Sequence, residues 1–139
     1  MARLCVLAVS ARLPPWAEAA CASYAARMPK GYAVERIAVK DERGLRSALP
    51  ALPRKGARLI VLDERGREYT TAQFARLLHA PAAFVIGGAE GLSAATKSEA
   101  DVLLRLSAMT LPHALAQVVV LEQIYRAATI LTGHPYHRE

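Results

Sequence analysis

The sequence has few cysteines and no long apolar run, and these absences remove several classes of protein. The 139 residues include two cysteines, Cys5 and Cys21, which are too few for a disulfide scaffold. There is no CxxC pair and no His/Cys cluster, so no metal site is expected. No segment reaches the roughly 18 apolar residues that a membrane span needs. Without internal repeats or linkers, the length suits one domain over residues 1–139.

The N-terminal segment resembles a signal peptide only superficially. Its apolar run, residues 4–9, is short, and Arg12 follows soon after. A buried first strand explains this pattern better than a secretory leader does. We therefore expect a cytoplasmic protein.

Basic residues outnumber acidic ones. Lysine and arginine total 18 against 12 aspartates and glutamates, which gives a net charge of +6 and a pI of about 9.7. This balance favours an anionic partner, with RNA as the leading candidate, although a soluble basic protein would look the same. Seven basic residues between positions 36 and 58 either bind RNA phosphates or lie on a solvated loop. They are Arg36, Lys40, Arg43, Arg46, Arg54, Lys55 and Arg58.

Apolar segments alternate with helical patterns along the chain. Continuous apolar runs are typical of strands that are covered on both faces in a parallel sheet. Strands are predicted at residues 4–9, 33–39, 58–63, 82–86 and 101–106. Helices are predicted at residues 14–28, 70–79, 93–100 and 112–132, with a short one near 45–49 and a turn at 63–66. This order predicts a parallel α/β fold.

Three of these strands deliver candidate binding segments to one edge of the sheet. In open parallel sheets, ligands bind outside the carboxyl ends of the strands. Leu62 ends one strand, Gly87 and Gly88 follow another, and residues 107–111 follow the last. The glycines either admit a ligand close to the backbone or form a structural turn. A phosphate-binding loop is disfavoured, because no lysine follows in Walker spacing and no GxGxxG opens a long helix.

The helix at residues 112–132 is apolar around its circumference. Pro112 suits its first turn, and Gly133 suits its left-handed end. Residues 118–121 are all apolar, and we interpret them as too many for one monomer core to cover. A second copy of the chain is the expected cover, in an obligate homodimer built on residues 114–131.

Polar residues on this helix allow two interpretations each. His113 lies beside the 107–111 loop, where it either exchanges a proton with a substrate or makes a helix-start hydrogen bond. Glu122 and Arg126 are spaced i, i+4, so they either pair on one helix stripe or leave Arg126 facing RNA.

The C-terminal tail carries three side chains suited to recognition, Tyr136, His137 and Arg138. Chain ends commonly fray, but Pro135 stiffens the backbone directly after the helix stop. Tyrosine stacks on an extruded base, and arginine binds phosphate or stabilises a base anion.

Three segments resemble the ribosomal large-subunit RNA methyltransferase H family, a family of knotted SPOUT methyltransferases. They are LSAMTLPH at 106–113, EQIYR at 122–126 and HPYHRE at 134–139. GGAEGLS at 87–93 is similar to the family's glycine loop, with Ala89 where a proline is usual, and residues 13–16, Tyr24 and 29–30 resemble its N-terminal pattern. The match is weakest between residues 40 and 84, where this chain is shorter than expected.

The resemblance implies a SPOUT-type fold with a C-terminal trefoil knot, in which residues 106–111 and the final helix pass through the preceding loop. It also implies S-adenosyl-L-methionine as cofactor and no metal. The cofactor would be held by backbone of the 106–111 loop, by the glycine turn and by an apolar contact. The residues implied are Leu62, Gly87, Gly88, Leu106, Ser107, Ala108, Met109, Thr110 and Leu111.

The implied reaction is methylation of N3 of a pseudouridine in 23S rRNA, in the stem-loop that faces the small subunit of the assembled ribosome. The implied site is composite across a homodimer, and its candidate catalytic residues are His113, Arg126, Tyr136, His137 and Arg138. Gln117 departs from the family pattern, which usually has arginine there, and so removes a permanent cation. The alternatives are methylation of another RNA, such as tRNA, and a non-catalytic basic domain that binds RNA or the ribosome.

Overall fold

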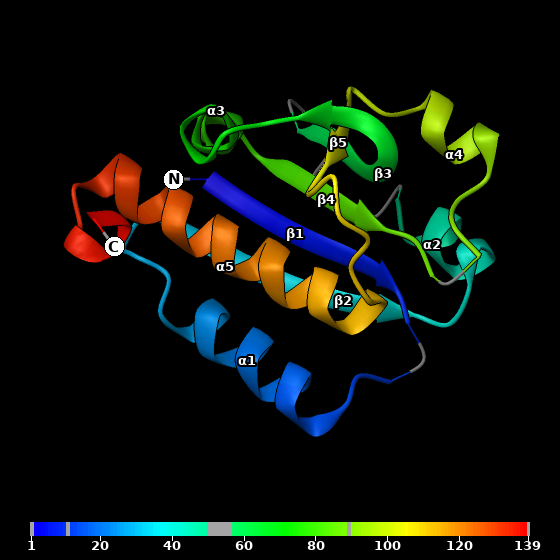
Figure 1. Cartoon of the computed structure of the whole chain (residues 1–139), viewed down its shortest axis with the longest axis horizontal. Coiled ribbons are helices and arrows are strands. Elements are labelled where there is room, and N and C mark those ends of the chain that lie inside the picture. The colour runs from blue at the N-terminus through cyan, green and yellow to red at the C-terminus, as the bar shows by residue number, and fades with distance from the viewer. Residues whose placement is uncertain (1, 11, 50–56, 89, 139) are drawn as a thin grey trace.

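Five parallel strands form one sheet in the order β2-β1-β4-β3-β5 (Figure 1). The computed structural model describes residues 2–10, 12–49, 57–88 and 90–138, so Arg54, Lys55 and Ala89 lie outside the described residues. The strands are β1 (Ala2–Val9), β2 (Tyr32–Val39), β3 (Arg58–Glu68), β4 (Ala82–Ile86) and β5 (Val102–Arg105). The parallel α/β prediction is confirmed; the knot and the single-domain assignment stay predictions.

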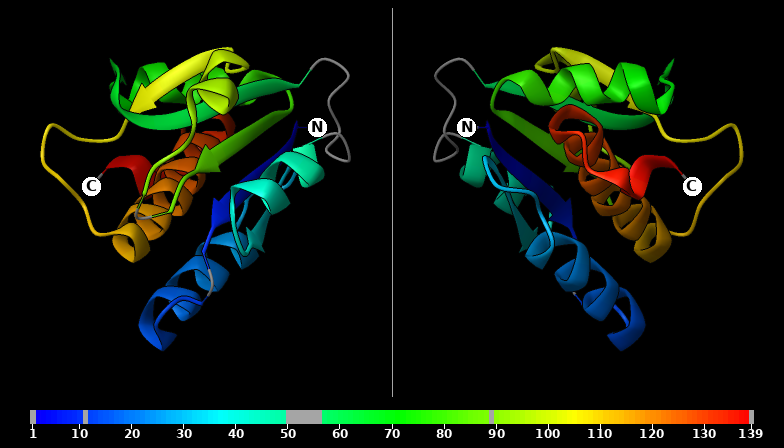
Figure 2. Two further views of the ribbon diagram at one scale, coloured as in Figure 1. Left: turned by 90° about the vertical axis from the view of Figure 1, so that its right-hand side faces the viewer. Right: turned by 90° about the vertical axis from the view of Figure 1, so that its left-hand side faces the viewer.

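Helices cover both faces of the sheet (Figure 2). One face packs against α1 (Pro15–Ala26), α3 (Thr71–Arg76) with its 3-10 extension η2 (Leu77–His79), and α5 (His113–Thr132). The other face packs against α2 (Glu42–Ala48) and the residues that flank α4 (Ala94–Ser98). The predicted helices are therefore present, with α3 ending at Arg76 rather than at residue 79.

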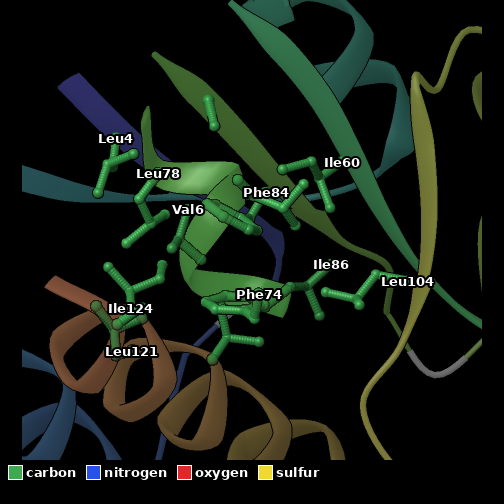
Figure 3. Packing of buried hydrophobic residues seen from close by; sticks show 14 of the residues in the cluster. Leu4, Val6, Ile60, Phe74, Leu78, Phe84, Ile86, Leu104, Leu121 and Ile124 are labelled. Atoms are coloured by element: carbon green, nitrogen blue, oxygen red, sulfur yellow. The ribbon is translucent and has the colours of Figure 1, made fainter. Parts of the chain in front are cut away.

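Alternate residues of β1 fill the two halves of the core. Val6 points into the cluster under α3 and α5, whereas Leu7 points to the α2 side, and both are fully buried. Figure 3 shows Phe74 and Phe84 together in the larger cluster, with their ring centroids 5.4 Å apart. Burial of each such side chain stabilises the fold by about 1.5–3 kcal/mol. Every residue of β4 is buried, which is why its sequence is continuously apolar.

Most of the apolar circumference of α5 is covered within the monomer. Val120 and Leu121 are fully buried, and Val118 packs against the same cluster. Only Val119 of the four residues at 118–121 is left outside both clusters, and Leu115 is exposed. One monomer therefore covers three of the residues 118–121, more than the sequence led us to expect, and the homodimer stays a prediction. By length and composition α5 would also suit a membrane, but its packing is that of a core helix.

The turn predicted at residues 63–66 is wrong, because β3 continues through it to Glu68. Residues 63–66 form a bulge, so that Leu62 and Arg67 both align with Leu104 of β5. Gly66 permits this close approach: a Cβ added there would lie 2.7 Å from the carbonyl carbon and oxygen of Leu103. Glycine inside a strand often marks such a bulge against neighbouring backbone.

Candidate functional site

Residues 62–65 in the middle of β3 and the carboxyl ends of β4 and β5 border a cleft of about 720 Å³. Its lining includes all nine residues that the resemblance assigned to cofactor binding: Leu62, Gly87, Gly88, Leu106, Ser107, Ala108, Met109, Thr110 and Leu111. His113 lines the same cleft from the start of α5. The fold therefore gathers these ten residues in one place, and their binding role stays a prediction.

The glycine turn brings bare backbone to the cleft wall. A Cβ added at Gly87 would lie 2.8 Å from Leu92 Cγ, and one at Gly88 would lie 3.3 Å from Val9 Cγ1. Gly91 adopts a left-handed φ of 76° and donates its N–H to the Gly88 carbonyl at 3.0 Å. Side chains at these positions would either strain the turn or fill the cleft.

A carboxylate from α2 fixes the far end of this turn. Glu42 accepts hydrogen bonds from the Ser93 N–H at 2.9 and 3.1 Å, from the Ser93 hydroxyl, and from the Thr96 hydroxyl at 2.5 Å. These bonds, led by the Ser93 hydroxyl, lower the pKa of Glu42 below its ordinary value. Ser93 also caps α4, at the start of the helix predicted at residues 93–100. Sequence reasoning missed Glu42, because Glu42 and Ser93 are 51 positions apart.

Charged side chains line the β3 side of the cleft and were also missed. Lys97 pairs with Asp63 at 3.4 Å, and the Asp63 side chain is 10% exposed. Glu64, Arg65 and Arg105 lie on the same lining. The bulge in β3 places Glu64 and Arg65 here, and no local pattern except Gly66 indicated it.

His113 belongs to a line of polar contacts that crosses from α5 to β2. Its Nε2 lies 2.8 Å from Nε2 of Gln117, whose side chain is fully buried. Arg36 Nη1 donates to Gln117 Oε1 at 3.1 Å, and Arg36 Nη2 pairs with Glu18 at 2.5 Å. The Arg36 side chain is 15% exposed, so it lies within the fold rather than on a solvated loop.

A second cluster surrounds Glu122 near the end of α5. Glu122 accepts from Arg126 at 2.8 and 3.0 Å, from the Tyr136 hydroxyl at 2.7 Å and from Gln123 at 2.7 Å. Burial alone would raise the pKa of Glu122, but these hydrogen bonds outweigh it and lower the pKa. The pairing interpretation of Glu122 with Arg126 is thus confirmed, and the Arg126 guanidinium also lies 4.8 Å from the Tyr136 ring centroid.

The tail is folded back on α5 as the 3-10 helix η3 (Pro135–Arg138). The Tyr136 ring packs edge-on against Tyr125, 4.6 Å between centroids, and the Arg27 guanidinium lies 5.6 Å from the Tyr136 ring. Burial and the bond to Glu122 raise the pKa of Tyr136. The backbone of His137 and Arg138 belongs to η3, while their side chains lie outside what the structure describes.

The two clusters occupy opposite ends of α5. His113 and Arg126 are 13 positions apart on one helix, a separation of about 20 Å along its axis. Figure 1 accordingly shows η3 at the end of α5 remote from the carboxyl ends of β1, β2 and β4. One chain therefore gathers His113 with the cleft but does not bring Arg126 or Tyr136 to it.

Comparison with known proteins gives consistent matches over nearly the whole chain. A family model described as "Predicted SPOUT methyltransferase" matches residues 2–137. The Ribosomal RNA large subunit methyltransferase H of Laribacter hongkongensis is 44% identical over 156 residues and covers 99% of each chain. That of Burkholderia ambifaria is 45% identical over 155 residues and covers 98% of this chain and 99% of its own. Both alignments are longer than the 139 residues here, so this chain is the shorter one.

Solved structures share the fold at low sequence identity. The SpoU methyltransferase AviRb from Streptomyces viridochromogenes, in complex with AdoMet, gives a TM-score of 0.54 at 15% identity over 93% of this chain and 57% of its own. A structure described as giving insight into 2-OH methylation of C/U34 on tRNA gives a TM-score of 0.58 at 21% identity. It covers 94% of this chain and 97% of its own.

Proposed function

Because this chain belongs to the SPOUT methyltransferase family, we propose that it methylates large-subunit ribosomal RNA with S-adenosyl-L-methionine as the methyl donor. The acceptor is N3 of a pseudouridine in 23S rRNA, in the stem-loop that faces the small subunit of assembled ribosomes in the cytoplasm. The observation that carries this proposal is the cleft beside the carboxyl ends of β4 and β5, in a chain 45% identical to a protein named ribosomal RNA large subunit methyltransferase H.

The cleft suits the cofactor in size and lining. Its volume of about 720 Å³ falls in the range of about 300–1,000 Å³ usual for sites of small molecules. The backbone of residues 106–111 would clasp the adenine, Gly87 and Gly88 would form the opposite wall, and Leu62 would add an apolar contact. When bound, the sulfonium supplies an already activated methyl group, so the protein needs only to align the acceptor and favour loss of its N3 proton.

The acceptor side is formed by the tail of a partner subunit. Within one chain, Arg126 lies about 20 Å along α5 from His113 at the cleft, and Tyr136 packs beside Arg126, so neither reaches its own cofactor site. A homodimer that joins the cleft of one subunit to the tail of the other resolves this separation. Tyr136 then stacks on the extruded base, His137 adds a hydrogen-bonding group, and Arg126 and Arg138 stabilise the base anion.

Methyl transfer to ribosomes tests the activity. Ribosomes from a strain that lacks its own enzyme are incubated with the purified protein and labelled cofactor, and the modified nucleotide is mapped. The expected product is one N3-methylated pseudouridine in 23S rRNA. Modification of tRNA instead would support the other RNA as substrate. If calorimetry detects no binding of the cofactor, the remaining interpretation is a non-catalytic domain that binds RNA.

Mixed dimers test the composite site. One chain carries Gly88→Val, which places side-chain atoms against Val9 and into the cleft. The other lacks residues 136–139. Each homodimer should be inactive, whereas the mixed dimer joins one intact cleft to one intact tail and should regain about half of the activity. Absence of rescue, with mixed dimers confirmed by native mass spectrometry, would refute the cross-subunit tail and leave the methyltransferase assignment intact.

A further inference from the structure

We propose that Arg36 and Gln117 are positioning residues that hold His113 as a hydrogen-bond donor toward the ligand in the cleft, with the imidazole proton on Nδ1. The identity of that ligand rests on the proposed function. The state of the imidazole does not, because it follows from contacts within this chain.

The first step is the orientation of the Gln117 amide. A guanidinium has only donors, so the atom of Gln117 that faces Arg36 at 3.1 Å must be the acceptor oxygen. Arg36 is itself held in place by Glu18 at 2.5 Å. Turning the amide over would set an NH₂ group against the guanidinium, donor against donor. One orientation of Gln117 is therefore fixed by the charge of Arg36.

The second step is that the orientation of the Gln117 amide determines which nitrogen of His113 carries the proton. With its oxygen on Arg36, Gln117 presents its NH₂ group to Nε2 of His113 at 2.8 Å. An amide nitrogen only donates, so Nε2 must accept and carries no proton. A neutral imidazole has one donor and one acceptor nitrogen, which places the proton on Nδ1. Gln117 is fully buried, so water cannot replace a contact that this arrangement loses.

The third step concerns what the imidazole offers to the cleft. His113 lines the cleft, and among the described residues its ring has no hydrogen-bond partner other than Gln117. Its free donor is Nδ1–H, and its acceptor nitrogen is already used. The ring therefore recognises an acceptor oxygen on the ligand, either the carboxylate of the cofactor's methionine moiety or a carbonyl beside the target nitrogen. It does not serve as the proton acceptor.

The tautomer is measured directly by long-range ¹H–¹⁵N NMR of the histidine rings in the free protein, with His113→Asn used to assign the signals. The wild-type spectrum should show Nε2 unprotonated and Nδ1 protonated. Gln117→Glu keeps the shape and the acceptor for Arg36 but presents a carboxylate oxygen to Nε2, so the proton should move to Nε2. The matched control is Gln73→Glu on α3, where the carboxylate keeps the contact to the Thr70 N–H and the His113 signals should not change.

Two further variants keep the test decisive if Gln117→Glu does not fold. Arg36→Lys retains a donor for Gln117 and should preserve the Nδ1 tautomer. Arg36→Leu frees the amide to turn and should give a mixture of both tautomers. A wild-type spectrum with the proton on Nε2, or a tautomer unchanged in both Gln117→Glu and Arg36→Leu, would overturn the proposal.

Binding and transfer identify the oxygen that His113 contacts. Loss of one hydrogen bond in Gln117→Glu should reduce the affected step on the order of tenfold. Weaker binding of S-adenosylmethionine in calorimetry assigns the contact to its carboxylate. Unchanged binding with slower methyl transfer assigns it to the base carbonyl. If neither step changes although the tautomer has moved, the donor role is refuted. Absence of any transfer by the wild-type protein would refute the proposed function and leave the NMR result standing.

Discussion

Among the described glycines, Gly66 is the position where replacing one hydrogen by a methyl group should destabilise this sheet most. The added Cβ of Gly66→Ala would lie 2.7 Å from both the carbonyl carbon and the carbonyl oxygen of Leu103. It would lie 2.8 Å from the carbonyl carbon of Leu104. All three atoms are backbone of β5, so no side chain can turn away. Overpacking of this kind costs about 1–3 kcal/mol, and because the sheet itself must part we expect the upper end, about 3 kcal/mol.

That cost converts into a measurable shift of the melting temperature. For a chain of this length, the entropy of unfolding is roughly 0.3 kcal/mol per degree, so about 3 kcal/mol lowers Tm by about 10 °C. Gly44→Ala is the matched control. Gly44 lies in α2, and a Cβ added there would be 3.4 Å from Val39 Cβ, an ordinary van der Waals contact. Alanine favours a helix over glycine by about 1 kcal/mol, so Tm should rise by about 3 °C.

Calorimetric melting of the wild type and both variants tests this reasoning. Gly66→Ala should also weaken binding of the cofactor, because β5 leads directly into the loop at residues 106–111 that lines the cleft. A Gly66→Ala protein that melts within a degree of the wild type would show that β3 and β5 separate without cost. The assignment of Gly66 as the residue that permits the bulge would then be refuted.

Three further predictions concern groups whose pKa or hydrogen bonds the fold changes. Burial, with a smaller effect of Glu35, raises the pKa of Cys5 to about 11, so iodoacetamide should leave it unmodified at neutral pH until denaturant is added, as peptide mapping would show. Hydrogen bonds lower the pKa of Glu42, so its carboxylate stabilises the folded protein above the ordinary carboxyl pKa of 4.5. This stabilisation is lost as the pH falls through the pKa of the folded state. In Glu42→Gln, Tm should therefore fall less steeply over that acidic range. Tyr136→Phe should lower the free energy of unfolding by about 1 kcal/mol in urea melts, because it loses the bond to Glu122 but keeps the ring contacts, and a loss above about 3 kcal/mol would contradict this.

The sequence predicted most of the sheet because parallel strands buried on both faces are read as continuous apolar runs. The run at residues 82–86 is β4 itself, and Gly133 ends α5 with the expected left-handed φ, here 76°. The extension of β3 was not predictable, because residues 63–66 have the composition of a turn. The continuation of β3 beyond them depends on the pairing of Arg67 and Glu68 with β5, which is distant in the sequence. Local propensity yields to such tertiary pairing.

Part of the candidate site could also be predicted from the sequence, and part could not. The cleft residues were predicted as neighbours because the carboxyl ends of parallel strands share an edge. The contact of Arg36 with Gln117 joins residues 81 positions apart, and no periodicity in one sequence links them. Sequence reasoning noted the missing arginine at position 117 but not that a cation arrives there from β2. That contact depends on two side chains that meet between β2 and α5, which only the packed structure reveals.

The place of α5 in the chain also has a consequence during protein synthesis. Leu121 and Ile124 cover the face of the sheet to which Val6 of the first strand contributes, yet more than a hundred residues separate them in the sequence. At translation rates of about 5–20 residues per second, about 6–23 seconds pass between the synthesis of Val6 and that of Leu121, which covers this apolar face. A nascent chain therefore exposes an incomplete sheet with an uncovered apolar face during most of its synthesis. Chaperone shielding should raise the yield of folded protein, and polypeptides released before residue 113 should aggregate.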